Sequence, residues 1–191
     1  QLKAIYGGEI FGFADHSPID EKAAAKDAGL GFIGKNGLII NPEYGSYVFI
    51  AELLFTSKLT ERLFENKYNC GICNACITAC PSGALNGSSF VREKCLSSIS
   101  QKKKKTDAER EALNKTATVW GCDICQNVCP YNKKAEYSKI EYFKNSFISS
   151  FTLENVCSMD DSTYNRYAFS YRPKAVLTEN FLTVNSKCDI I

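Results

Sequence analysis

A closely spaced run of cysteines between residues 70 and 80 constrains this chain more than any other feature. The run has the spacing C-x2-C-x2-C-x3-C-P, formed by Cys70, Cys73, Cys76, Cys80 and Pro81. This is the bacterial run that ligates [4Fe–4S] clusters, and in proteins with two clusters its fourth cysteine ligates the other cluster. The run therefore predicts that a second set of cysteines lies elsewhere in the chain.

A second, incomplete run lies at residues 119–130, which read VWGCDICQNVCP. Val119 stands where the first cysteine of the repeat would fall, and Cys95 lies between the two runs. The simplest complete assignment is two [4Fe–4S] clusters with thiolate ligands throughout. One cluster takes Cys70, Cys73, Cys76 and Cys129, and the other takes Cys80, Cys95, Cys122 and Cys125.

Disulfides and two zinc sites are the alternative interpretations of these cysteines. Disulfides are typical of small secreted chains, and zinc sites usually show separated C-x2-C pairs rather than this run. The clusters are therefore favoured. Cys157 and Cys188 fall outside any ligand spacing and are expected to be ordinary free cysteines. His16 is the only histidine and is expected to be a turn or surface residue, so no catalytic histidine pair is predicted.

The composition is that of an ordinary globular protein of one or two domains. Of 191 residues, 45% are hydrophobic and 23% are charged. No apolar run reaches the roughly 18 residues that a membrane span needs, so no membrane association is expected. The net charge of +2 does not by itself indicate a nucleic-acid partner. The chain begins with Gln1 and carries no signal peptide, so we expect a fragment of a cytoplasmic protein with reduced thiolates.

The first thirty residues read as a helix end, a strand and a second helix. Residues 10–14, IFGFA, predict a short buried strand. Ser17 is a good N-cap and Pro18 suits the first helical position, so a helix is predicted that continues through residues 21–27 and stops at Gly29. Asp15 would then lie at the strand end, just outside the helix N-terminus. Taken alone, it reads as a surface acid favoured by the helix dipole.

Three glycines after this helix, Gly29, Gly31 and Gly34, spell G-x-G-x-x-G. A dinucleotide site needs a strand before these glycines and a helix opening within them. Here a helix precedes them and an apolar segment follows, so they predict a tight helix-to-strand connection instead. Lys35 and Asn36 lie in this connection and read as part of a solvated polar loop.

Two apolar runs, residues 37–40 and 46–55, flank five turn-forming residues. This pattern predicts a β-hairpin, and the second run is apolar enough to suggest a strand buried on both faces. Residues 56–69 then link this portion to the cysteine portion, with a boundary near residue 65.

A run of four lysines at residues 102–105 lies between the two cysteine runs. Such a run is usually a solvated loop, although beside a redox site it could also contact phosphates. Thr106 and Glu109 then predict the capped start of a helix.

The chain beyond residue 132 is polar and aromatic, and we expect short helices packing over a ferredoxin-like core. An aromatic stripe is more often core than binding surface. Its members are Phe143, Phe147, Phe151, Tyr164, Tyr167, Phe169 and Tyr171.

Five separated blocks carry a resemblance to a known family: FADHSPIDEKAAAKDAGLGFIGKNGLII, GSYVFIAELL, CGICNACITACPSGAL, REKCLSSIS and GCDICQNVCPYNK. In content, order and spacing they resemble the epoxyqueuosine reductases, the cobalamin-dependent iron–sulfur enzymes of queuosine modification in tRNA. The first block is the most specific, because two-cluster motifs occur in many electron carriers.

The resemblance implies an α+β fold in which a remnant of an α/β corrinoid-binding reductase domain precedes a bicluster ferredoxin-like domain. The implied parts are the C-terminal part of the cobalamin-binding domain at 1–65, the double-cluster domain at 66–135 and a short helical segment at 136–191. The family's N-terminal portion and its C-terminal helical-repeat extension are not recognisable here.

The resemblance also implies roles for particular residues. Asp15 matches the acid that serves as proton donor, and the family's cluster ligands match the eight cysteines assigned above. Lys35 and Asn36 fall in a block that lines the corrinoid pocket, and Asp123 lies in a segment that approaches cobalamin. Basic residues that face tRNA in the family correspond to Lys103, Lys104 and Lys105.

The implied activity is the reductive removal of the epoxide oxygen of epoxyqueuosine in tRNA, with two [4Fe–4S] clusters and cobalamin as cofactors. The expected partners are tRNA and a low-potential donor such as ferredoxin or flavodoxin, with the protein acting as a monomer. One alternative is a bicluster ferredoxin-type electron carrier, which accounts for residues 66–133 but leaves 1–55 without a purpose. Another is a corrinoid reductase of the reductive-dehalogenase type, which the first block disfavours.

Overall fold

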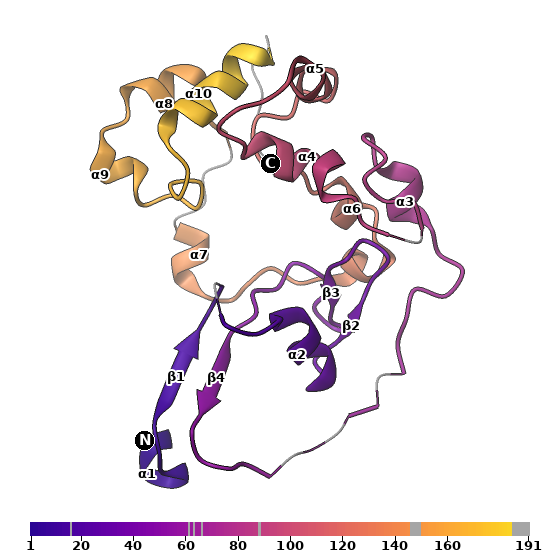
Figure 1. The fold of residues 1–191 in the computed structure, drawn as a ribbon, viewed down its shortest axis with the longest axis vertical. Helices are drawn as coiled ribbons and strands as arrows, with labels where there is room; N and C mark the ends of the chain where they lie inside the picture. The colour runs from indigo at the N-terminus through magenta and orange to yellow at the C-terminus, as the bar shows by residue number, and fades with distance from the viewer. Residues whose placement is uncertain are drawn as a thin grey trace. The chain divides into compact units, whose positions relative to one another are not determined.

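The computed structural model describes residues 1–15, 17–60, 62, 64–65, 67–87, 89–145 and 150–184 (Figure 1). Of the residues discussed above, His16, Phe147 and Cys188 lie outside these ranges. The chain forms two compact units. The first unit comprises residues 1–76 and 126–136, and the second comprises 77–125 and 137–191.

The compact units do not follow the boundaries predicted near residues 65 and 135. The first unit takes in both the start of the cysteine run and a later segment, 126–136. The physical cause is a set of hydrogen bonds between that segment and the turn at Ser46. The predicted domain boundaries themselves stay a prediction, because compact units and domains need not coincide.

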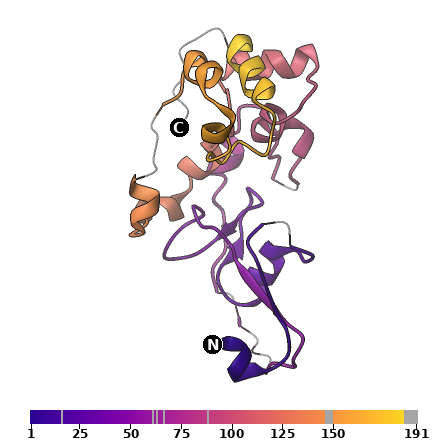
Figure 2. The same cartoon turned by 90° about the vertical axis from the view of Figure 1, so that its left-hand side faces the viewer.

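The first unit begins with a helix and a strand, as the sequence predicts. Helix α1 (Leu2–Tyr6) precedes strand β1 (Ile10–Phe13), and β1 pairs antiparallel with β4 (Glu52–Phe55). The two strands run side by side in Figures 1 and 2. The prediction that the first strand is buried is wrong, because Phe11 is 52% exposed.

Helix α2 (Glu21–Asp27) ends before Gly29 as predicted, but it begins three residues after the predicted first position, Pro18, and has a different N-cap. The carboxylate of Asp20 accepts hydrogen bonds from the backbone N–H groups of Lys22 and Ala23, each at 3.1 Å. The Ser17 hydroxyl instead bonds to the backbone of Ile19. The predicted Ser17 cap is therefore wrong, because a cap must stand directly before the first helical turn to reach its free N–H groups.

The predicted hairpin between residues 37–40 and 46–55 is also wrong. Strand β3 (Ile39–Ile40) pairs with β2 (Phe32–Ile33), and the later strand β4 pairs with β1. The turn between the two predicted strands contributes a single bridge between Asn41 and Gly45. Nor is the second run buried on both faces, since Phe49 is 94% exposed.

Gly31 confirms the predicted tight connection between α2 and the strand that follows. A Cβ atom at Gly31 would lie 2.4 Å from the carbonyl oxygen of Ile40, on the opposite strand. Backbone atoms cannot move away as the end of a side chain can, so only glycine allows this approach. The glycine pattern therefore serves backbone packing here.

The second unit is helical in its described part. Across both units, the elements that follow β4 are α3 (Ala75–Ala79), η1 (Arg92–Lys94), α4 (Leu96–Ser100), α5 (Asp107–Lys115), α6 (Ile124–Asn127), η2 (Pro130–Lys134), α7 (Glu141–Asn145), α8 (Leu153–Ser158), α9 (Asp161–Tyr164) and α10 (Lys174–Thr183). None of the helices in the described ranges is long and apolar enough to cross a membrane.

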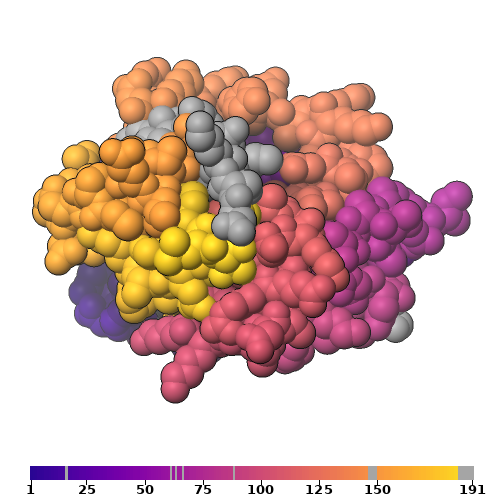
Figure 3. All heavy atoms as spheres, turned by 90° about the horizontal axis from the view of Figure 1, so that it is seen from above, coloured from indigo at the N-terminus to yellow at the C-terminus, as the bar shows by residue number. Residues whose placement is uncertain are grey.

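One hydrophobic core joins α4 and α5 to the C-terminal helices of the second unit. Figure 3 shows residues 150–184, orange to yellow, against the red segment that carries these two helices. The core comprises Leu96, Ile99, Leu113, Val119, Phe151, Val156, Tyr164, Phe169, Leu177, Phe181 and Val184. The predicted aromatic core is confirmed for three of its members, whereas Phe143 and Tyr171 are exposed.

Val119 explains why the second cysteine run is incomplete. Its side chain is buried in this core, and its carbonyl oxygen accepts a hydrogen bond from Asn180 Nδ2 at 2.8 Å. The same amide nitrogen donates to the carbonyl of Ser100 at 2.7 Å. A position committed to packing in this way is poorly placed to supply a ligand.

The capped helix start predicted at Thr106 is confirmed. The Thr106 hydroxyl accepts from the Glu109 N–H, and the Glu109 carboxylate accepts from the Thr106 N–H, which completes a capping box.

Candidate metal centre

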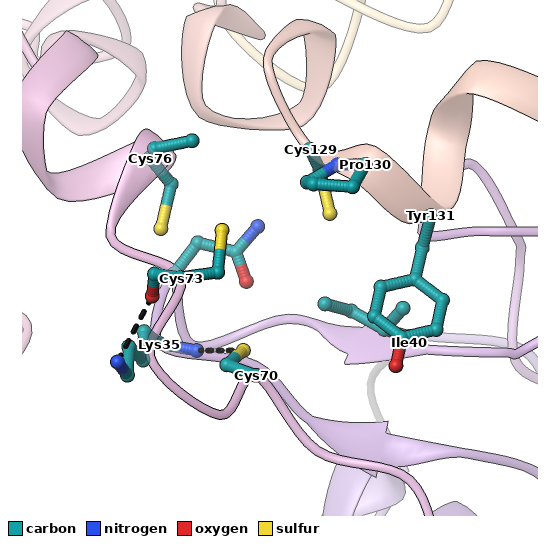
Figure 4. A pocket seen from close by; sticks show the side chains of 10 residues that line it. Lys35, Ile40, Cys70, Cys73, Cys76, Cys129, Pro130 and Tyr131 are labelled. Carbon is teal, nitrogen blue, oxygen red and sulfur yellow. Dashed lines mark hydrogen bonds between the residues drawn. The ribbon is translucent and has the colours of Figure 1, made fainter.

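Four cysteine thiols line one pocket of the first unit. Cys70, Cys73 and Cys76 come from the first cysteine run, and Cys129 comes from the end of the second. Figure 4 shows their sulfur atoms facing a common space, with Ile40 and Tyr131 beside them. The pocket volume is about 40 Å³, roughly three times what one water-sized group needs. These are the four cysteines that the spacing assigns to one cluster.

Cys129 reaches this pocket because its segment is tied to the turn at Ser46. The Asn132 Oδ1 atom accepts from the Ser46 N–H at 2.7 Å, and Asn132 Nδ2 donates to the Ser46 hydroxyl at 2.9 Å. The Ser46 hydroxyl also bonds to Gln126 at 2.9 Å. Tyr131 then packs edge-on against Phe32, with ring centroids 5.1 Å apart. The sequence patterns did not reveal this anchor, which joins Ser46 to residues 80 and 86 positions away.

Lys35 fastens the first cysteine run to the β2–β3 connection. Its ammonium donates to the carbonyls of Gly71 and Cys73 and to Asn74 Oδ1, each at 2.9 Å. Its backbone N–H also points at the Cys70 sulfur, with an N–S distance of 3.4 Å (Figure 4). The expectation of a solvated loop residue is therefore wrong for Lys35. The predicted corrinoid contact stays a prediction.

Asn36 is buried against the same pocket and has a donor without a partner. It is 6% exposed, and its Oδ1 accepts from the Leu38 N–H at 3.3 Å. Its Nδ2 atom is buried and has no hydrogen-bond acceptor in the part of the chain that the structure describes. Gly34 leaves room for this side chain, because a Cβ at Gly34 would lie 2.7 Å from Asn36 Oδ1. The solvated-loop expectation is therefore wrong for Asn36 too.

The remaining four assigned cysteines belong to the second unit. Cys80 ends the first run, Cys95 precedes α4, and Cys122 and Cys125 lie at the start of the second run. Burial raises the pKa of the Cys122 thiol, and negative charge on Cys95 and Cys80 raises it further, so these three thiols lie near one another. Iron binding would deprotonate such thiols outright.

The Cys80 thiol is biased toward the thiolate form by its surroundings. Burial raises its pKa, but hydrogen bonds from the Leu85 N–H and from the Ser82 side chain and backbone outweigh burial and lower it. The thiolate is the form that ligates metals. Asp123 adds to the negative charge beside Cys122.

The arrangement of the thiols fits a cluster better than the alternatives. All the cysteines in the described ranges are free thiols, Cys157 among them, as expected. Within the same ranges no group of three or more histidine, cysteine, aspartate or glutamate side chains converges closely enough for a single metal ion. A zinc ion needs every sulfur about 2.3 Å from the metal, whereas a four-iron cluster holds its thiolates further apart. The donor set thus suits a [4Fe–4S] cluster.

The other predicted site residues lie outside the thiol pocket. Asp15 is exposed in the loop after β1, where its φ of 70° puts it in the left-handed region. Lys103 and Lys104 are exposed, whereas Lys105 is buried. The Lys105 ammonium donates to the Lys102 carbonyl at 2.8 Å and lies 3.4 Å from the Glu179 carboxylate. Its predicted contact with tRNA therefore conflicts with its burial.

Residues 69–132 match a family model described as a 4Fe-4S double cluster binding domain. The epoxyqueuosine reductase of Gloeobacter violaceus is 35% identical over 169 residues, which cover 85% of this chain and 53% of the relative. The chain belongs to the epoxyqueuosine reductase family. It spans about half the length of the curated relatives that it matches.

Solved epoxyqueuosine reductases also match the fold. One, bound to an epoxyqueuosine-modified tRNA-Tyr stem loop, has a TM-score of 0.74 and 28% identity over 96% of this chain and 50% of its own. Another, from Bacillus subtilis, has its catalytic aspartate loop swung out of the active site; its TM-score is 0.75 and its identity 27%, with the same coverage. The mixed α and β fold of this chain is thus that of the family.

In this family member, Lys35 is expected to hold the cysteine loop in place. Replacing Lys35 with methionine keeps the aliphatic chain but removes three hydrogen bonds, each worth roughly 1 kcal/mol. We expect a chelator to remove iron from the first-unit thiols of the reconstituted variant at least about tenfold faster than from the unaltered protein. The iron held by the second-unit thiols should be released at the unaltered rate. The measurement is the time course of iron release under anaerobic conditions.

Lys22→Met is the matched control for this variant. Lys22 also donates to a backbone carbonyl of the first unit, that of Gly37 at 2.8 Å, but it does not contact the cysteine loop. Equal iron release from both variants would show that Lys35 contributes nothing specific to the loop.

Proposed function

We propose that the full-length protein is an epoxyqueuosine reductase, which removes the epoxide oxygen of epoxyqueuosine in tRNA. The proposal rests on the match in sequence and fold over most of this chain. Removing that oxygen to leave a carbon–carbon double bond consumes two electrons and two protons and releases water. The pocket lined by four cysteine thiols supplies a site for an electron-transfer group.

In this proposal the eight cysteines hold two [4Fe–4S] clusters, and the full-length protein also binds cobalamin. When bound, these groups supply electrons at low potential. The first cluster takes Cys70, Cys73, Cys76 and Cys129, which line one pocket. The second takes Cys80, Cys95, Cys122 and Cys125, all in the second unit. Residues 1–65 would be the C-terminal part of a cobalamin-binding domain, followed by the ferredoxin-like domain and the helical segment 136–191.

Asp15 is the proposed proton donor. It holds a proton on its carboxyl group and delivers it to the departing epoxide oxygen. Two observations support this role: Asp15 lies in a loop at a strand end with a left-handed backbone, and a related structure has a catalytic loop, named for an aspartate, that is swung out of its active site. Non-glycine residues with such backbones occur preferentially at functional sites.

The proposed tRNA contact falls on Lys103 and Lys104, whose exposed ammonium groups can reach phosphates. Lys105 is left out because its charge is buried beside Glu179. Asp123 is proposed to lie near cobalamin, as the family resemblance implies. A low-potential ferredoxin or flavodoxin would deliver the electrons.

The proposal is tested with the full-length protein, reconstituted anaerobically with iron and sulfide and supplied with cobalamin and a low-potential reductant. We expect it to convert epoxyqueuosine to queuosine in tRNA, as seen by mass spectrometry of digested nucleosides. Conversion should require cobalamin. Reduction of a chlorinated organic substrate with tRNA left unchanged would instead favour a dehalogenase-type enzyme. Electron transfer to an acceptor protein as its sole activity would favour an electron carrier.

A further inference from the structure

We propose that the side-chain amide of Asn36 donates a hydrogen bond to a sulfur atom of the cluster held by the first-unit thiols and thereby raises its reduction potential. The inference rests on the proposed function in requiring that these thiols hold a cluster. Asn36 lines the thiol pocket, and its buried Nδ2 atom has no acceptor among the described residues.

The orientation of the amide is set by its oxygen. Asn36 Oδ1 accepts from the Leu38 N–H at 3.3 Å, which leaves Nδ2 on the other side of the amide group. The side chains of Asn36 and Ile40 both pack close over Gly34, because a Cβ added at Gly34 would lie 2.7 Å from Asn36 Oδ1 and 2.5 Å from Ile40 Cδ1. If the amide were rotated so that Oδ1 and Nδ2 exchanged places, the Nδ2 donor would face the Leu38 N–H, which is also a donor. The orientation with Oδ1 toward Leu38 is therefore favoured.

An unpartnered donor at this depth needs an explanation. Asn36 is 6% exposed and therefore 94% buried. A buried amide donor without an acceptor is destabilising. The pocket walls offer it sulfur, since four thiols line the same space. Lys35 beside it already donates its backbone N–H to the Cys70 sulfur at 3.4 Å. Two successive residues would thus supply N–H donors to sulfur atoms of one site.

The effect on the potential follows from charge. Reduction adds an electron to the cluster, and donors to its sulfur atoms stabilise the more negative state, so hydrogen bonding is one of the factors that set cluster potentials. Asn36 belongs to the same unit as Cys70, Cys73, Cys76 and Cys129, whereas the thiols assigned to the other cluster belong to the second unit. The donor should therefore act on one cluster and leave the other unchanged.

The test is an EPR-monitored redox titration of the reconstituted full-length protein and its Asn36→Leu variant, which removes the donor at similar volume. We expect the equilibrium constant for reducing one cluster to fall by about three- to tenfold. At about 59 mV per tenfold for one electron, this lowers the midpoint potential by about 30–60 mV. The other cluster is the internal control. Asn36→Asp keeps the size of the side chain but replaces the donor with an anion. It should lower the potential of the first-unit cluster more than Asn36→Leu does.

Asn41→Leu is the matched control variant. Asn41 also lies in the first unit, but its amide bonds to the Leu30 carbonyl and its oxygen to the Glu43 and Tyr44 N–H groups. We expect it to leave both potentials unchanged. An equal shift in Asn41→Leu and Asn36→Leu, or no shift in Asn36→Leu with both clusters present, would overturn the inference and leave the proposed function standing.

A measurement on the unaltered sequence keeps the inference testable if a variant fails to fold. Protein labelled with 15N in asparagine side chains should show a 15N coupling to the reduced cluster in pulsed EPR, lost in Asn36→Asp. A reduced cluster without this coupling would overturn the inference alone. A protein that binds no cluster at these thiols would overturn the inference and the proposed cluster ligands together.

Discussion

Replacing Asp15 with asparagine in the full-length protein is expected to lower turnover of epoxyqueuosine-containing tRNA by roughly 10²–10⁴-fold, the usual contribution of a positioned proton donor. The carboxamide has the same size but cannot release a proton to the departing oxygen. Asparagine is also the right replacement for the backbone, because Asp15 has a φ of 70° and asparagine tolerates this left-handed region better than alanine does. The measurement is single-turnover conversion with cluster content and cobalamin binding assayed in parallel.

Asp27→Asn is the charge-matched control for this experiment. Asp27 is an exposed acid at the last position of α2 in the same unit, and its replacement removes the same charge far from any proposed chemistry. We expect wild-type turnover from this variant. Wild-type turnover in Asp15→Asn as well, with cofactors retained, would refute the role of Asp15 as proton donor.

Replacing Cys129 with serine is expected to remove one whole cluster and leave the other. Cys129 is the buried member of its set and comes from far along the chain, so its loss leaves a cubane with three thiolates in a pocket that solvent can enter. Iron and acid-labile sulfide should fall from about eight to about four atoms of each per chain. Turnover should be lost with the cluster. The measurement is chemical iron and sulfide analysis after anaerobic reconstitution.

Cys157→Ser is the control, because Cys157 is an exposed free thiol outside both ligand sets. It should keep all the iron. The remaining EPR spectrum also tests which cluster Cys129 serves: in Cys129→Ser it should match that of Cys70→Ser rather than that of Cys122→Ser. The reverse match would show that each run keeps its own fourth cysteine, contrary to the assignment.

Local patterns were sufficient for several elements. Helix α2 ends where predicted because its helix-favouring residues are followed by a glycine, and α5 begins at its predicted capping box. The spacing rule, which sends the fourth ligand of each run to the other cluster, also predicted that Cys129 would lie beside the first run. The pocket brings Cys129 beside the first run, and cluster binding by these thiols stays a prediction.

Strand pairing was not predictable from the same patterns. An apolar run shows that a segment can form a strand but not which strand it meets, so β4 was assigned to β3 when it pairs with β1. The N-cap of α2 failed for a similar reason at shorter range, because Ser17 and Asp20 are both good caps and only the backbone path chooses between them.

The sequence by itself determined the chemistry available to this protein: eight cysteines at ligand spacing, an aspartate that opens the D-x-x-P sequence of residues 15–18, and the blocks that place the chain in its family. Only the tertiary structure decided how neighbouring residues use that chemistry. It buried Lys105 beside Glu179, joined Lys35 to the cysteine loop and placed Asn36, with its buried amide nitrogen, at the wall of the thiol pocket. The physical reason is that ligand spacing is a property of adjacent residues, whereas burial and hydrogen-bond partners depend on segments that meet only when the chain has folded.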